Sequence, residues 1–349
     1  MFNLESLVRP NVLKMKPYSS ARDEFKGSAS IFIDANENNI GSLAGSNYNR
    51  YPDPHQKKLK QKIAQLKGVR PSQIFLGNGS DEAIDLLFRM LCQPGHDVML
   101  HLPPTYGMYE VSANLNDVQL DAVQLTADFQ VPVEEVLAQV KPNTKLIFIC
   151  SPNNPTANLI NPESIEAILK GFNGVVVVDE AYIDFCDSPS WITRLDEFPN
   201  LLVLQTFSKA WGMAGLRLGL AFASEELIQL LDKIKPPYNI NEATQELALQ
   251  ALEKSEDLRY MIEEIVQERE LLKHALPRLE SVLHVYPSDA NFLLVKVTDA
   301  NGMYNYLVEN GIVVRNRSSL PGCEGCLRIS VGTLEENQKL LKAMASFRL

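Results

Sequence analysis

Short apolar runs alternate with segments of helical periodicity over residues 55–250. Three of these runs, Lys145–Cys150, Val175–Val178 and Leu201–Leu204, are almost entirely apolar, which is typical of strands that are buried on both faces. Helical segments between such strands favour a mostly parallel sheet with helices on its faces. The strands predicted for this part of the chain are 74–76, 97–101, 118–123, 145–150, 175–178 and 201–204, and the predicted helices are 55–67, 80–92 and 106–115.

The pattern changes after about residue 240. Residues 242–275 predict one long, charged helix, and shorter elements follow it. This order predicts an α/β protein with a large domain over 31–245 and a smaller α+β domain over 246–349 that begins with the long helix. The first 30 residues have no strong pattern, and we expect them to pack on the small domain or on a partner subunit. The later elements are strands at 291–297, 312–316 and 327–331 and helices at 301–309 and 334–346.

Composition and charge narrow the class of protein. The chain has 349 residues, of which 45% are hydrophobic and 22% charged, so it can bury a core without disulfides or metals. A formal net charge of −10 argues against binding to nucleic acid or to an anionic membrane, because both need a basic surface. No apolar run reaches the ~20 residues of a membrane span, and the first residues lack the pattern of a signal peptide. We therefore expect a cytoplasmic protein.

The cysteines and histidines do not predict a metal site. Cys323 and Cys326 have the CxxC spacing, but the chain has no second pair of this kind and its five histidines are scattered. Zinc needs four clustered ligands. We therefore favour a turn that enters a strand over a zinc site or a redox pair.

The first predicted strand is followed by Gly77–Glu82, which opens a helix. In open α/β sheets, ligands bind beyond the carboxyl ends of the strands. Free N–H groups at the start of a helix bind anions, and glycines let the anion approach closely. An ordinary helix cap is the alternative for the same residues. The segment is neither a Walker A loop nor a GxGxxG dinucleotide motif.

Three more strand ends carry candidate chemistry. Asn154 follows the strand at 145–150 within a proline-rich turn. An ordinary turn without a functional role is the alternative for this segment. Asp179 ends the next strand, with Tyr182 three residues later. A carboxylate at the end of a buried strand is costly unless a cation pairs with it, although it can also cap a helix.

Lys209 lies five residues beyond the strand at 201–204. A lysine amine that is removed from water has a lowered pKa and can form a Schiff base. Arg217 follows beyond a turn that contains two glycines, and its guanidinium can bind a phosphate. A lone lysine is usually a solvated surface residue, so the prediction depends on the whole set of strand-end residues.

In their order and spacing these motifs resemble the fold type I aminotransferases, which use pyridoxal 5′-phosphate. The resemblance spans nearly the whole chain and is closest to the histidinol-phosphate aminotransferases. The shared motifs are Gly79-Ser80-Asp81, Tyr106, Asn154-Pro155-Thr156, Asp179-x-x-Tyr182, Ser208-Lys209 and Arg217. The closer match uses residues 17–22, 34–38, 50–54, 103–109, Arg315 and 326–332.

The resemblance implies a role for each residue around the cofactor. Lys209 holds the cofactor aldehyde and transfers the substrate proton, and Asp179 pairs with the pyridine nitrogen. Asn154 and Tyr182 bind the ring 3′-oxygen, and Tyr106 stacks on the ring. The residues implied to surround the phosphate are Gly79, Ser80, Asp81, Thr206, Ser208 and Arg217.

The resemblance also implies a substrate site and a partner. Arg328 binds the substrate anion, assisted by Arg315, Tyr18 and Asn36. Because Arg317 lies two residues from Arg315 on the same strand face, the sequence leaves open which of the two faces the substrate. Tyr51 is implied to reach the cofactor phosphate of a neighbouring subunit, so that a homodimer shares its active sites.

The implied reaction is transamination between L-histidinol phosphate and 2-oxoglutarate, which gives imidazole-acetol phosphate and glutamate in histidine biosynthesis. Within the same cofactor class, an aromatic amino-acid aminotransferase and a threonine-phosphate decarboxylase are the alternatives. A cofactor-binding transcription regulator would need a basic DNA-binding domain, and a nicotinamide-dependent dehydrogenase would need a GxGxxG turn. The chain lacks both features.

Two departures from the family pattern bear on the backbone. Ala157 stands where many relatives have glycine, so we expect no positive φ at this position. Residues 36–39 lack the proline that is common after Glu-Asn in relatives.

Overall fold

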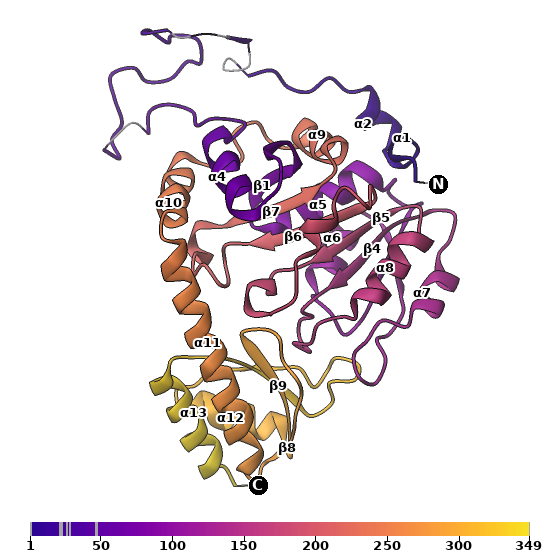
Figure 1. Ribbon diagram of the computed structural model, residues 1–349, viewed down its shortest axis with the longest axis vertical. Coiled ribbons are helices and arrows are strands. Elements are labelled where there is room, and N and C mark those ends of the chain that lie inside the picture. Colours follow the sequence, from indigo (N-terminus) through magenta and orange to yellow (C-terminus); the bar gives the residue numbers. More distant parts are fainter. Residues whose placement is uncertain (1, 21–23, 26, 28, 46–47, 349) are drawn as a thin grey trace.

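A seven-stranded sheet forms the larger part of the molecule (Figure 1). The computed structural model describes residues 2–20, 24–25, 27, 29–45 and 48–348. The neighbouring strands from β6 to β3 are parallel, whereas β7 runs antiparallel to both of its neighbours. The sheet is therefore mostly parallel, as expected. In spatial order its strands are β1 (Ile74–Asn78), β7 (Leu218–Ala223), β6 (Leu201–Thr206), β5 (Val175–Asp179), β4 (Thr144–Cys150), β2 (Val98–His101) and β3 (Gln119–Ala122).

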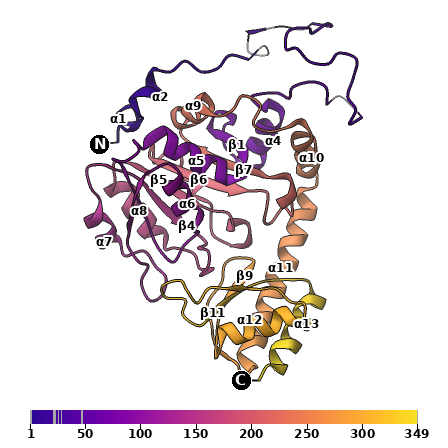
Figure 2. The same cartoon turned by 180° about the vertical axis from the view of Figure 1, so that it is seen from behind.

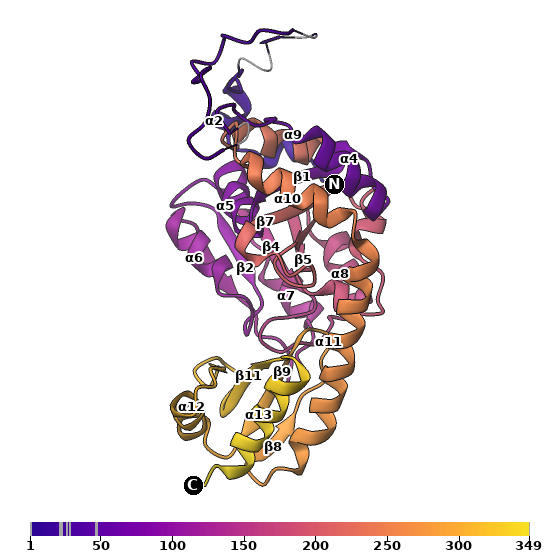
Figure 3. The same cartoon turned by 90° about the vertical axis from the view of Figure 1, so that its left-hand side faces the viewer.

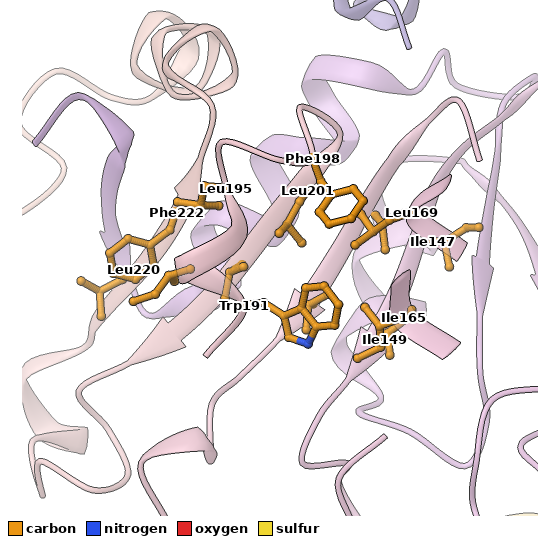
Figure 4. Close-up of a cluster of buried hydrophobic side chains, with 14 of the residues drawn as sticks. Ile147, Ile149, Ile165, Leu169, Trp191, Leu195, Phe198, Leu201, Leu220 and Phe222 are labelled. Carbon is orange, nitrogen blue, oxygen red and sulfur yellow. The ribbon is translucent and has the colours of Figure 1, made fainter. Parts of the chain in front are cut away.

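The central strands carry apolar residues at every position because they serve two cores. In β5, Val176 and Val178 belong to one hydrophobic cluster, and Val175 and Val177 belong to a second cluster on the opposite face. Successive side chains of a strand point to opposite faces, so both faces need apolar residues. Figure 4 shows part of the first cluster, with side chains from β4, β6 and β7 packed among those of the covering segments.

Helices cover both faces of this sheet (Figures 1 and 2). The first cluster receives buried side chains from α4, α7, α8 and α10, and the second receives them from α5, α6 and α9. The bounds are α4 (Lys57–Lys67), α5 (Ser80–Leu91), α6 (Met108–Leu115), α7 (Val133–Gln139), α8 (Pro162–Gly171), α9 (Glu225–Ile234) and α10 (Glu242–Leu252), with 3₁₀ turns at Pro71–Gln73, Ile183–Phe185, Trp191–Arg194, Ala214–Leu216 and Leu276–Arg278.

A smaller antiparallel sheet follows, in the order β10-β11-β9-β8. Its core lies between the sheet and three helices, as the side view in Figure 3 shows. The strand expected over 312–316 is limited to two residues. The elements are α11 (Ser255–Ala275), β8 (Val282–Val285), β9 (Phe292–Val297), α12 (Ala300–Glu309), β10 (Arg315–Asn316), β11 (Cys326–Ser330) and α13 (Leu334–Ser346).

The single helix expected over 242–275 is wrong, because the structure divides it into α10 and α11. The break falls at Glu253 and Lys254, where the chain leaves the large sheet for the small one. The buried residues of α10 pack with the large-sheet core, whereas Leu272 of α11 packs with the small-sheet core. Both residues at the break are compatible with a helix, so the periodicity did not predict the interruption.

The beginning of the chain packs on the large sheet, which corrects the expectation for that part of the N-terminal segment. The short helices α1 (Leu4–Leu7) and α2 (Pro10–Lys14) place Val8 and Val12 in the cluster shared with α5 and α9. The Arg9 amide donates to the Met90 carbonyl at 3.0 Å. These apolar side chains therefore fill the helical layer over the large sheet and not the small domain.

The described residues between α2 and α4 follow an irregular path beyond α9 and α4, at the end of the molecule away from the small sheet (Figures 2 and 3). Apolar side chains in this path are strongly exposed, among them Ile33 at 80% and Ile40 at 99%. We refer to the described residues within 15–52 as the arm. No helix among the residues described has the length and apolar character needed to cross a membrane.

The close approach of β7 to the start of α5 predicts the effect of a single methyl group. A Cβ atom at Gly219 would lie 2.1 Å from both the Gly79 carbonyl carbon and the Ser80 amide nitrogen. We expect Gly219→Ala to lower the free energy of unfolding by about 1–3 kcal/mol, because the backbone must move to admit it. Gly215→Ala is the control, since a Cβ there meets no atom within 4 Å. Urea denaturation that found both variants equally stable would contradict this account.

Candidate active site

A cavity of about 470 Å³ opens at the carboxyl ends of β4, β5 and β6, between the two sheets. The three strand ends contribute Cys150, Asp179 and Thr206 to its wall. Of these three, Asp179 and Thr206 are predicted site residues. The other predicted site residues that line the cavity are Gly79, Ser80, Asp81, Tyr106, Asn154, Tyr182, Ser208, Lys209, Arg217, Arg315 and Arg328. The cavity thus brings together all but three of the predicted site residues.

One end of the cavity is built to hold an anion. Gly79 precedes the first residue of α5, a helix of 12 residues, and its φ of 72° suits a glycine. Its amide donates to the Arg217 carbonyl at 2.6 Å, which ties the helix start to the turn before β7. The Arg217 guanidinium lies 3.5 Å from the Asp81 carboxylate and remains half exposed. Helix N–H groups, a guanidinium and the Ser208 hydroxyl therefore surround this end.

Asp179 occupies the middle of the cavity floor and is almost completely buried. Its carboxylate accepts hydrogen bonds from the Tyr109 hydroxyl at 2.7 Å and from the Ala181 amide at 3.1 Å. Burial raises the pKa of Asp179 to about 6 despite these donors. In the described part of the chain no lysine or arginine forms an ion pair with it, so the carboxylate is free to pair with a cationic atom of a ligand.

Lys209 faces the same space from the turn after β6. Its surface is accessible through the open cavity, yet the cavity walls remove water from the amine, and this desolvation lowers the pKa of Lys209. The nearby Arg328 and Arg217 guanidinium groups lower this pKa further, whereas the Asp179 carboxylate opposes the shift. Nζ lies 5.5 Å from the centre of the Tyr182 ring. The amine therefore loses its proton, and becomes nucleophilic, more readily than that of an ordinary lysine.

A chain of polar contacts links Tyr182 to the small domain. The Asn154 side-chain nitrogen Nδ2 donates to the Tyr182 hydroxyl at 3.4 Å, and the Arg328 guanidinium donates to the Asn154 side-chain oxygen Oδ1 at 2.6 Å. Burial raises the pKa of Tyr182, so its hydroxyl stays protonated and can donate. Phe292 of β9 contacts both Tyr182, at 5.0 Å between ring centres, and the Arg328 guanidinium, at 5.3 Å. These contacts fix the positions of Asn154 and Tyr182.

The small domain contributes three arginines to the cavity wall. Arg315 stands opposite Arg328 in the antiparallel ladder, and Arg315, Arg317 and Arg328 all line the cavity. Both candidates at positions 315 and 317 therefore face the same space.

Tyr18, Asn36 and Tyr51 are the three predicted site residues that do not line this cavity. All three belong to the arm and are exposed, Tyr18 at 70% and Tyr51 at 52%. The Tyr51 ring stacks on Tyr238 with 4.5 Å between the ring centres. Because the arm leads away from the cavity of its own chain, a single chain does not bring these side chains into the site.

Tyr109 is a site residue that the sequence reasoning missed. Its side chain is fully buried, contacts the Tyr106 ring edge-on at 5.5 Å and donates to Asp179. Burial raises the pKa of Tyr109 well above its ordinary value, which keeps the donor protonated. Its spacing of three residues from Tyr106 was a usable signal, because such residues lie on the same side of a helical turn. Other lining residues that were not predicted are Thr105, Gly107, Met108, Val111, Cys150, Pro155, Ala181 and Leu320.

The expectation for Ala157 is wrong, because its φ is +71°. Its amide donates to the Asn153 carbonyl and its carbonyl accepts from the Asp289 amide, both at 2.8 Å. The side chain is fully buried against Tyr182 and Phe292. These contacts hold the turn that carries Asn154 in a conformation that an alanine rarely adopts on its own.

The donor set fits pyridoxal phosphate. The cavity offers an anion site at one end, an unpaired buried carboxylate for a ring cation in the middle, and a lysine with a lowered pKa beside it. Together with a mostly parallel sheet and a smaller C-terminal sheet, this arrangement defines a fold type I pyridoxal-phosphate-dependent enzyme.

Comparisons with known proteins agree with this class. The family described as Aminotransferase class I and II matches residues 22–344, and the chain belongs to it. The histidinol-phosphate aminotransferase of Cytophaga hutchinsonii is 54% identical over 99% of each chain. That of Parabacteroides distasonis is 55% identical over the full length of both chains. A histidinol-phosphate aminotransferase from Sinorhizobium meliloti, solved with pyridoxal-5′-phosphate, is similar with a TM-score of 0.80, 25% identity and 89% coverage of each chain.

The raised pKa of Asp179 predicts a pH-dependent stability. The folded protein binds a proton more readily than the unfolded chain between about pH 4 and 6, so this group destabilises the cofactor-free protein increasingly as pH rises through that range. We expect Asp179→Asn to gain stability relative to the parent as pH rises from 4 to 7, by at most roughly 3 kcal/mol. Urea denaturation across this pH range measures the difference. Glu180 titrates in both proteins and cancels, and a difference that does not change with pH would refute the assignment.

Proposed function

We propose that the protein transfers the amino group of L-histidinol phosphate to 2-oxoglutarate, as in histidine biosynthesis. The observation that carries this proposal is one cavity with two separate cationic ends and Lys209 between them. The end at α5 fits the phosphate of the cofactor, and the arginines of the small domain then need a second anion, which the substrate supplies. The names of the relatives at 54% and 55% identity support the same substrate.

Pyridoxal phosphate, when bound, supplies the electron sink for the electron pair that the substrate Cα retains when its proton leaves. In this chain, Lys209 Nζ is the group that would remove that proton from Cα and return it at the C4′ atom of the cofactor. Its lowered pKa matters because only the unprotonated amine can accept a proton. The accessible surface of Lys209 leaves room for the side chain to move between these two atoms.

Asp179 has the role of holding a proton on the ring nitrogen of the cofactor. Tyr109 and Ala181 donate to its carboxylate and keep it in place. When a cation pairs with this carboxylate, its raised pKa falls and the charged form is favoured. Asn154 and Tyr182 lie within hydrogen-bonding distance of each other and are assigned to the ring oxygen.

The phosphate of the cofactor is assigned to the start of α5. Ser80 and Asp81 offer backbone N–H groups there, and Gly79, whose own amide binds the Arg217 carbonyl, leaves the approach to them open. Ser208, Thr206 and Arg217 lie around them. Tyr106 lines the same end, and its hydroxyl donates to Asp81 at 3.3 Å. Its ring is thereby placed to stack on the cofactor ring.

Arg328 and Arg315 are assigned to the substrates. Histidinol phosphate and glutamate share an amine but carry different anions, so one site must accept a phosphate in one half-reaction and carboxylates in the other. Planar guanidinium groups bind both kinds of anion with paired hydrogen bonds. We infer a large domain that ends with α10 and a small domain that begins with α11, so the boundary expected between residues 245 and 246 falls inside α10 and is too early. This division places these arginines on the domain opposite Lys209.

We further propose that the protein acts as a homodimer whose arms complete the neighbouring active sites. Ile31, Ile33 and Leu43 of the arm are at least 75% exposed, which is costly unless another surface covers them. Tyr18, Asn36 and Tyr51 lie on this arm and not in the cavity of their own chain. In this arrangement Tyr51 reaches the cofactor phosphate of the partner, while Tyr18 and Asn36 reach its substrate. A cytoplasmic location stays a prediction from the sequence.

A visible absorption spectrum of the cofactor-loaded protein tests the proposed reaction. We expect histidinol phosphate, added without a keto acid, to bleach the yellow band of the bound cofactor, and 2-oxoglutarate to restore it. Phenylalanine at equal concentration serves as the control for an aromatic amino-acid aminotransferase, and threonine phosphate for a decarboxylase. A band that responds to phenylalanine and ignores histidinol phosphate would refute the substrate assignment. Lys209→Ala should lose the response altogether.

Mixed dimers test the shared active site. Lys209→Ala and Tyr51→Ala variants are each expected to have little activity, because one lacks the base and the other weakens the partner's cofactor site. After mixing and subunit exchange, one site of each mixed dimer has both native residues, so activity should rise above that of either parent. Arg217→Ala mixed with Lys209→Ala is the control, since both residues lie in the same chain's cavity. Equal behaviour of the two mixtures would exclude a shared site.

A further inference from the structure

Arg317 is a cavity residue that none of the roles above uses. It follows β10, and its backbone is held on both sides: its amide donates to the Cys326 carbonyl, and its carbonyl accepts from the Leu320 amide, both at 2.9 Å. The side chain is half-buried and lines the cavity beside Arg315 and Arg328. The guanidinium thus projects from a fixed turn into the substrate end of the cavity.

The three arginines have no counter-charge of their own. Throughout the described residues, none of the three forms an ion pair with a carboxylate, and the small domain contributes no acidic residue to the cavity wall. Arg328 already donates to Asn154, whereas the buried Nε of Arg317 has no hydrogen-bond partner. Burial lowers the pKa of Arg317, and the neighbouring Arg328 and Arg315 lower it further. An uncommitted, partly desolvated cation of this kind favours a ligand of high negative charge.

We propose that Arg317 is a specificity-determining residue that makes this site prefer a doubly charged phosphate monoester over a carboxylate. The proposal rests on the proposed function, because it assigns the phosphate of the amino donor to the cluster of Arg315, Arg317 and Arg328. A phosphate carries close to two negative charges and three acceptor oxygens at neutral pH. Three guanidinium groups can satisfy all three oxygens, whereas a carboxylate has one charge and two oxygens.

A purely structural role explains Arg317 less well. A structural arginine is expected to bind backbone carbonyls or a carboxylate, as Arg269 does with the carbonyls of Ala290 and Phe185. Among the described residues, Arg317 makes hydrogen bonds only through its backbone. No hydrogen bond within the chain therefore occupies the donors of its guanidinium.

The test compares Arg317→Gln and Arg317→Lys with the parent, all loaded with cofactor. Arg259→Gln is the matched control, because it removes the same charge from an 85% exposed side chain on α11. Spectral titration measures the Kd of histidinol phosphate, of histidinol without the phosphate, and of glutamate. We expect Arg317→Gln to weaken histidinol phosphate about 10- to 100-fold and to leave histidinol and glutamate nearly unchanged. Arg317→Lys should recover part of the loss, since it restores the charge without the planar fork.

Inorganic phosphate provides a second readout that does not depend on the identity of the amino donor. We expect it to compete with the amino donor in the parent and in Arg259→Gln, and to compete much more weakly in Arg317→Gln. Equal competition in all three proteins, or an equal loss of affinity for histidinol phosphate and glutamate, would overturn the role of Arg317. A parent enzyme that ignores histidinol phosphate but is inhibited by phosphate through Arg317 would refute the proposed substrate and keep the phosphate site.

Discussion

The carboxylate of Asp179, buried at the end of a central strand, is the constraint around which the site is organised. Its position follows from β5 being covered on both faces, which removes water from the strand end as well as from the valines before it. Two donors stabilise the charge without neutralising it, and burial still raises the pKa of Asp179 above its ordinary value. A cationic ligand atom that pairs with this carboxylate offsets the cost of burying it, and the position of Asp179 in the cavity wall makes such a pairing possible.

The rest of the cavity is placed by a reversal of the chain beside that strand. β7 runs antiparallel between β6 and β1, and this brings the Lys209 turn, Arg217 and the start of α5 to one edge of the sheet. The approach is so close that β7 has no room for a side chain at Gly219. The amine and the anion site therefore come from segments about 130 residues apart in sequence, Lys209 and Gly79, yet they are held together by the two pairings that β7 makes, with β6 and with β1. Backbone geometry, more than any single side chain, sets their separation.

The parts that the sequence predicted and those it did not differ in physical origin. Strand ends could be located because a two-faced core forces apolar residues at every strand position, and Asp179 interrupts such a run. The break between α10 and α11 and the positive φ of Ala157 are imposed by tertiary contacts and leave no local signal. β7 was missed because its Leu-Gly-Leu-Ala-Phe-Ala segment directly follows Arg217, and this part of the chain was interpreted only for its chemistry. Tyr18, Asn36 and Tyr51 of the arm were assigned to the site by resemblance alone, because no pattern of hydrophobic and polar residues in the chain indicates their position relative to the cavity.

The net charge of the chain and the local charges in the cavity act on ligands in opposite ways. Only the local charges favour anionic ligands. The whole chain carries a formal charge of −10, which repels anions at long range but is screened beyond about 8 Å at physiological ionic strength. Within the cavity, Arg217 at one end and the arginines of the small domain at the other dominate, because the surrounding walls reduce screening. Binding of an anion is therefore decided after entry, by hydrogen bonds in fixed directions, and not by attraction from solution. A site of this kind distinguishes ligands by the number and geometry of their oxygens, which is the property that separates a phosphate from a carboxylate.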